Sequence, residues 1–209
     1  DLARLVHQAP LGWLLSPDQE DPLAAALPLV PQVDGQGRLA TLRGHLARRN
    51  PLVGRLGRQP RALVLFMGPQ GYISPSWMRD RSQAPTWNYA SLQCVVDVQL
   101  QDAAVTEADL RELVMQQEAG RPQAWSVDDM GERFGRLSQG IIGLRASVRS
   151  VRARFKLGQD ERDDVYQDIT AALSDRAQSA ELLAWMRHCN PGRLHGQLGQ
   201  DARPVRDTD

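Results

Sequence analysis

The segment "LRGHLARRNP", residues 42–51, holds the side chains of this sequence that are best suited to bind an anion. Successive residues of a strand point to opposite faces, so Arg43 and His45 would share one side of a strand here. Arg48 and Asn50 follow at the predicted strand end, where a turn brings side chains together. Arginine forks beside an imidazole suit a terminal phosphate. An exposed edge strand kept soluble by its charges would show the same residue types, so both interpretations stay open.

The charge distribution around this segment favours an anion. The formal net charge is +0, but no acidic residue lies between Asp34 and Asp80, where eight arginines fall. Lys156 is the only lysine of the chain. A stretch without acidic residues creates a positive local field suited to a phosphate.

Other kinds of site have little support. Metal-ligand spacing is not found, because the histidines are scattered: His7, His45, His188 and His195. No G-x-S-x-G motif is present. The carboxylate pairs at residues 128–129 and 163–164 stand at predicted helix starts, where the helix dipole accounts for them. We therefore predict no metal site and name no catalytic residue.

The rest of the sequence predicts a mixture of strands and helices without regular alternation. Strand patterns cover residues 12–16, 24–34, 39–47, 61–69, 86–102 and 147–157, with a hairpin turn at Asp34-Gly35 and a strand end at Gly68-Pro69. Helix patterns cover residues 1–10, 106–120, 126–141 and 163–189, with a break near Ser174, and residues 50–60 are expected to form a short helix or a turn. The pairs Thr106/Asp109 and Ser126/Asp129 have the spacing of capping boxes. Residues 193–209 are predicted to be disordered.

This order predicts an α+β fold that is mainly β. The strands lack alternating crossover helices, and no G-x-G-x-x-G or Walker motif is present, so an antiparallel barrel is favoured over a parallel α/β sheet. We predict a barrel domain at residues 1–160 with inserted helices. A C-terminal helical extension and a disordered tail would follow at residues 161–209.

Four segments in order resemble the PaiB family of FMN-binding negative transcriptional regulators: "TLRGHLARRNP", "LVLFMGPQGYISPSWM", "PTWNYA" and "EAGRPQAWSVDDM". The resemblance covers about residues 10–173, and the pairing of "YISPSW" with "TWNY" is its most specific part. It implies the FMN-binding split β-barrel, similar to pyridoxamine phosphate oxidases. It also implies a homodimer with the flavin at the subunit interface.

The resemblance also implies which residues would contact FMN. Four of them, Arg43, His45, Arg48 and Asn50, would form the basic side of the phosphate site. Trp87 and Asn88 would lie along the ring system or the adjoining interface, with Tyr72 left to the core. The segment "RFKLGQDE" stands where the family typically reads "KWKLSQNR", which adds Lys156 and Gln159.

The chain departs from the family pattern at several polar positions. Phe155 replaces Trp, Gly158 replaces Ser, Asp160 replaces Asn and Glu161 replaces Arg. Met78 stands where the family has Tyr, and Ala25-Ala26 stand where it has Asn-His. These changes remove polar contacts while the segment from Arg43 to Asn50 is kept.

Three functions follow as hypotheses. The first is a flavin-binding negative regulator, acting on DNA directly or indirectly; neither a helix-turn-helix motif nor a basic net charge supports direct binding. The second is an FMN-dependent oxidoreductase, and the third is a degenerate barrel that serves as a dimeric interaction module. No apolar run is long enough for a membrane span, and no export leader is found. Two separated cysteines, Cys94 and Cys189, are expected as reduced thiols of a cytoplasmic protein.

Overall fold

The computed structural model describes residues 1–17 and 21–193. The chain divides into two compact units: unit 1 joins Asp1–Gly68 to Ala90–Arg154, and unit 2 joins Pro69–Tyr89 to Phe155–Asp209. The units do not coincide with the predicted segments 1–160 and 161–209, because residues 69–89 group with the C-terminal part. The predicted disorder of residues 193–209 concerns positions that, apart from Arg193, lie outside the described residues.

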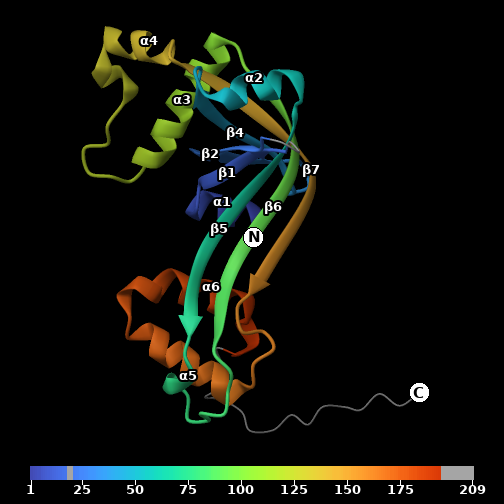
Figure 1. Cartoon of the computed structure of the whole chain (residues 1–209). Coiled ribbons are helices and arrows are strands. Elements are labelled where there is room, and N and C mark those ends of the chain that lie inside the picture. Colours follow the sequence, from blue (N-terminus) through green and yellow to red (C-terminus); the bar gives the residue numbers. More distant parts are fainter. Residues whose placement is uncertain (18–20, 194–209) are drawn as a thin grey trace. The chain divides into compact units, whose positions relative to one another are not determined.

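Seven strands form one antiparallel sheet in the order β2-β1-β5-β6-β7-β4-β3 (Figure 1). Their bounds are β1 Leu11–Ser16, β2 Leu23–Pro28, β3 Val30–Val33, β4 Leu39–Ala47, β5 Arg61–Ile73, β6 Thr86–Leu100 and β7 Ile141–Lys156. Three of these strands, β5, β6 and β7, contribute residues to both units. This architecture confirms the predicted α+β, mainly β class.

Unit 1 contains two hairpins of the sheet, β1–β2 and β3–β4. β1 pairs with β2, and β3 pairs with β4 across a turn in which Asp34 accepts hydrogen bonds from the backbone of Gln36 and Arg38. This turn is the hairpin predicted at Asp34-Gly35. β4 also pairs with β7, with Arg43 opposite Arg145 and His45 opposite Gly143.

One face of β1 and β5 is buried and the other is apolar but exposed. Leu14 and Val64 are paired across the two strands and are fully buried. On the opposite face Trp13 is paired with Leu65, and Trp13 is 55% exposed. The remaining apolar side chains of this outward face are Leu11, Leu15, Leu63 and Met67, with Ala24 and Ala26 of β2 beside them. We call these eight side chains the outward face of unit 1.

The helices of unit 1 are α1 Leu2–Gln8, α2 Pro51–Arg58, α3 Ala103–Glu118 and α4 Glu132–Ser138, with a short 3₁₀ turn at Val127–Met130. Ser126 and Asp129 form the predicted capping box. The predicted cap of α3 at Thr106 was wrong: Asp102, four residues earlier, caps the helix by accepting a hydrogen bond from Val105 N. Thr106 lies within the helix.

The predicted end of β5 at Gly68-Pro69 was also wrong, because the strand continues to Ile73. Gly68 is needed here for close packing. A Cβ at this position would lie 2.3 Å from Leu5 Cδ1 of α1, which is far closer than two carbon atoms can approach. A glycine inside a strand often marks such a close approach, so it is not by itself a sign of a strand end.

Unit 2 is built around α5 (Asp163–Ser174) and α6 (Ala180–Cys189), with 3₁₀ turns at Pro75–Trp77, Ala177–Ser179 and Pro191–Arg193. The break predicted near Ser174 is confirmed. Trp185 of α6 is fully buried and stacks on Phe155, with ring centroids 5.5 Å apart. Arg79 ties the loop after β5 to α5 through Asp168. Within the described ranges 1–17 and 21–193, none of the helices has the length and apolar character to cross a bilayer.

Candidate functional site

Arg43 and His45 lie on the same face of β4, as the strand alternation predicts, while Leu42, Gly44 and Leu46 are buried on the other face. This shared face is covered by α3. Arg43 is only 7% exposed, which is unusual for an arginine unless its charge is paired.

The pairing of Arg43 is internal. Its Nη1 donates to Asp109 Oδ1 at 2.8 Å and to Glu112 Oε2 at 2.6 Å, and its Nη2 donates to Glu112 Oε1 at 2.5 Å. The contact with Glu112 is therefore a bidentate fork. Arg145 is paired with Arg43 in the sheet, and its Nη2 lies 4.0 Å from Asp109 Oδ1. We call these four side chains the Arg43 cluster.

The Arg43 cluster sets the charge states around it. Hydrogen bonds from Arg43 hold the pKa of Glu112 below its usual range. The same bonds raise the pKa of Arg43, so its guanidinium stays charged. Burial lowers the pKa of His45, because the imidazolium would lose its solvation.

Two polar atoms of the Arg43 cluster lack a hydrogen-bond partner. Among the residues that the structure describes, Arg43 Nε and Asp109 Oδ2 are buried without a hydrogen-bond partner. Arg43 and Asp109 line a cavity of about 10 Å³ between β4 and α3, together with His45 and Thr106. That volume holds about one water molecule.

Arg48 and Asn50 lie in the turn after β4. Arg48 is exposed, and its Nε donates to the carbonyl of Gln139 at 2.9 Å. Asn50 caps α2 by accepting a hydrogen bond from Leu52 N, and Pro51 takes the first helical position. The Asn-Pro sequence is a helix-start signal, so this capping role could have been predicted.

The remaining predicted site residues lie in unit 2 and have different surroundings. Trp87 is 53% exposed and makes an edge contact with Tyr72, with ring centroids 6.0 Å apart. Asn88 is buried on the opposite face of β6 and donates to Met186 Sδ at 3.6 Å. Trp87 and Asn88 therefore lie on opposite faces of β6, as alternation within a strand requires. Tyr72 is 46% exposed, so its expected place in the core was wrong.

Lys156 and Gln159 mark the end of β7. Lys156 Nζ donates to Thr86 Oγ1 on the neighbouring strand. The side chain of Gln159 accepts from Leu157 N and donates to the carbonyl of Phe155, so it closes the turn after β7. Gly158 has a φ of +79° in this turn, a conformation that disfavours the serine found in the family pattern.

Asp109 and Glu112 were not predicted as partners of Arg43. Asp109 was assigned to a capping box, and that assignment was wrong because the helix begins earlier. Their spacing of three residues on one helix face was the available signal. Pairing them with a distant strand needs the tertiary structure. No cluster of candidate metal ligands occurs in the part of the chain that the structure describes.

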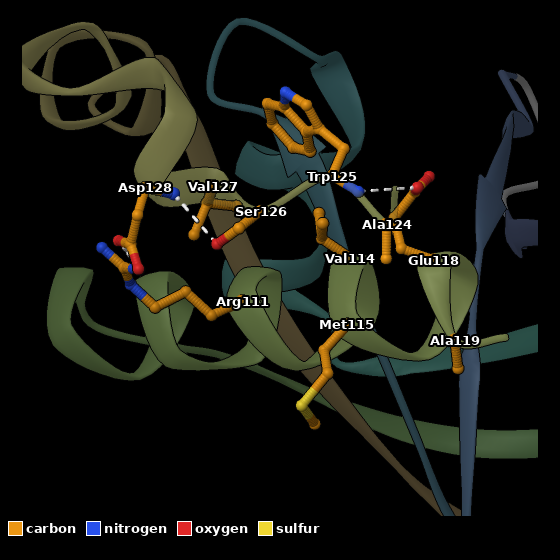
Figure 2. Close-up of a pocket in the computed structure, with 10 residues that line it drawn as sticks. All are labelled: Arg111, Val114, Met115, Glu118, Ala119, Ala124, Trp125, Ser126, Val127 and Asp128. Carbon is orange, nitrogen blue, oxygen red and sulfur yellow. Dashed lines mark hydrogen bonds and ion pairs between the residues drawn. The ribbon is translucent and has the colours of Figure 1, made fainter. Parts of the chain in front are cut away.

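Figure 2 shows a second hollow of unit 1, of about 480 Å³, between α3 and the loop that follows it. Apolar side chains line most of it, among them Val114, Met115 and Trp125. Glu118 accepts a hydrogen bond from Trp125 N at 3.1 Å, which holds the loop on the C-terminal end of α3. None of the predicted site residues lies in this hollow.

Comparison with known proteins gives a family match over most of the chain. Residues 1–150 match the FMN_bind_2 family, described as "Putative FMN-binding domain". The protein "Protease synthase and sporulation protein PAI 2" of Bacillus subtilis is 25% identical over 189 residues, covering 88% of this chain and 90% of the relative. An uncharacterized protein of Saccharomyces cerevisiae is 31% identical over 138 residues, covering 61% of this chain and 81% of that protein.

Solved structures show the same fold at low identity. The FAD and heme binding protein of Mycobacterium smegmatis superposes with a TM-score of 0.55 at 17% identity, covering 81% of this chain and 76% of that chain. The flavocytochrome Anf3 of Azotobacter vinelandii superposes with a TM-score of 0.53 at 15% identity, covering 74% and 65%. This likeness confirms the predicted split β-barrel.

Proposed function

Because the chain belongs to the FMN_bind_2 family and is a PaiB-like FMN-binding protein, we propose that it works as a homodimeric flavin-dependent regulator. The observation that supports this proposal best is the extent of the family match. It covers residues 1–150 and therefore includes all of β4 and the turn after it. The proposal also takes the cytoplasm as the location, where the buried Cys94 would stay a thiol.

The residues present fit FMN in kind. A phosphate needs accessible cationic donors, and exposed Arg48 and Arg49 provide them at the end of β4. A flavin ring needs an exposed aromatic or apolar surface, and Trp87 with Tyr72 offers one in unit 2. We propose Arg43, His45, Arg48 and Asn50 for the phosphate side, and Trp87, Asn88, Lys156 and Gln159 for the ring side. Bound FMN would supply reversible electron uptake.

The homodimer is supported by the outward face of unit 1. Leu11, Trp13 and Met67 are 63%, 55% and 54% exposed on adjoining strands. A contiguous apolar surface on sheet strands marks an interaction site more often than a solvated face. We propose that a second copy of the chain covers it.

The regulatory role follows from the resemblance to PaiB, and direct DNA binding is the part to be tested. A gel-shift titration at several salt concentrations distinguishes direct from indirect regulation, because binding to phosphates weakens steeply with salt. We expect no salt-dependent shift for a protein of zero net charge, and therefore regulation through a partner. A strong shift that weakens with salt would contradict indirect regulation.

We expect Arg48→Ala to weaken FMN binding about tenfold, because it removes a charged donor to the phosphate. Binding of riboflavin, which lacks the phosphate, should not change. Fluorescence titration of the apo protein with both flavins measures the two effects. Arg58→Ala is the matched control, since Arg58 is an exposed arginine at the far end of α2. Equal effects of the two substitutions on FMN binding would show that Arg48 does not contact the phosphate.

A further inference from the structure

The attachment of α3 to unit 1 is unusual for a helix of 16 residues, because Thr106 is its only buried residue among those described. Leu110, Leu113 and Val114 are half-buried, and Met115 is 66% exposed. A helix in a folded domain normally gains most of its stability from a buried apolar face. Polar anchors must therefore contribute a large share of what holds α3 in place.

Two such anchors exist. At the N-terminal end, Thr106 Oγ1 accepts a hydrogen bond from Gly143 N at 2.9 Å and donates to the carbonyl of Asp102 at 2.6 Å. Gly143 permits this approach, since a Cβ there would lie 2.7 Å from Thr106 Oγ1. One and two turns further on, Asp109 and Glu112 hold Arg43. The first anchor uses neutral groups, whereas the second depends on carboxylates that a different anion can replace.

The geometry around Arg43 excludes a ligand while α3 is in place. The guanidinium side chain is 9% exposed, and the adjoining cavity has room for about one water molecule. A phosphate group is larger than a water molecule and carries its own charge. It can reach Arg43 only if Asp109 and Glu112 withdraw. The partnerless Arg43 Nε would then gain an acceptor.

We propose that α3 is a latch over Arg43, in which Asp109 and Glu112 hold the guanidinium until the phosphate of a flavin mononucleotide displaces them. This inference rests on the proposed function and adds its regulation. Displacement exchanges one set of charge-assisted hydrogen bonds for another, so the two states differ modestly in free energy. Thr106 and Gly143 keep the start of α3 in place, and the rest of the helix, with the loop at Trp125, moves. Binding of the phosphate would thereby change the surface formed by α3 and the loop at Trp125. An indirect regulator needs such a change so that a partner can distinguish the bound protein from the free one.

The test compares Glu112→Gln with Glu107→Gln, which makes the same change of charge on the same helix. Glu107 accepts a hydrogen bond from Ser138 and does not contact Arg43. We expect Glu112→Gln to bind FMN about tenfold more tightly than wild type, a typical size for coupling of this kind. Its affinity for riboflavin, and both affinities of Glu107→Gln, should match wild type. FMN affinity of Glu112→Gln that equals or falls below that of Glu107→Gln overturns the latch.

If no form of the protein binds FMN, the proposed function fails. A second measurement then tests the latch without a flavin. Hydrogen exchange of residues 103–118 in the wild-type protein is recorded with inorganic phosphate and with sodium chloride of equal ionic strength. Faster exchange of residues 109–118 in phosphate alone supports the latch without a flavin. Identical exchange in the two salts overturns it.

Discussion

Replacing Arg43 with Ala is expected to lower the free energy of unfolding by about 3 kcal/mol, because the substitution leaves the largely buried carboxylate of Asp109 without its main partner. Asp109 has a side chain that is 12% exposed, so water can compensate it only in part. The half-exposed Glu112 adds less. Urea unfolding followed by circular dichroism measures the loss, and the helical signal of α3 should melt first.

Arg48→Ala is the control for this prediction. Arg48 is exposed and bonds to a single backbone carbonyl, so its loss should cost less than about 1 kcal/mol. A small effect of Arg43→Ala, similar to that of Arg48→Ala, would show that the Arg43 cluster does not stabilise unit 1. In that case a phosphate that binds Arg43 would have no strong internal contact to displace.

The second large effect is expected on the outward face of unit 1. Trp13→Glu should weaken self-association at least about 100-fold, because it removes a large exposed aromatic side chain from the proposed interface and buries a charge there. Light scattering after size-exclusion chromatography, over a range of protein concentrations, reports the change from dimer to monomer.

Val33→Glu is the matched substitution for this test. Val33 is 51% exposed at the end of β3, on the opposite edge of the strand order from β1 and β2. It should leave the dimer intact. If the wild-type protein is a monomer at all concentrations, or if both substitutions dissociate it equally, the outward face is not the subunit interface.

Most strands and helices could be predicted from the sequence, because their signals are local. The alternation around Arg43 and His45, the turn at Asp34 and the helix start at Asn-Pro are all read within a few residues. The exceptions depend on contacts between distant segments. Gly68 resembles a strand end until Leu5 is seen beside it, and the true cap of α3 at Asp102 competes with Thr106, whose hydroxyl contacts Gly143.

The candidate site was harder to predict for the same reason. Residue types pointed correctly to a basic segment at the end of β4, but they could not show that Arg43 is already held by carboxylates 66 and 69 positions away. Strand alternation alone would have predicted that Trp87 and Asn88 lie on opposite faces of β6, but it was not applied to them. Charge pairing across the fold therefore needs the structure, whereas side-chain alternation within a strand does not.

We propose above all that this chain binds FMN through its phosphate as well as its ring. Titration of the apo protein with FMN and with riboflavin, followed by quenching of flavin fluorescence, tests it most directly. We expect saturable binding of FMN with a Kd at least about tenfold lower than that of riboflavin, the difference that charged phosphate contacts provide. Equal affinity for the two flavins would contradict the phosphate site, and no uptake of either flavin would contradict the claim as a whole.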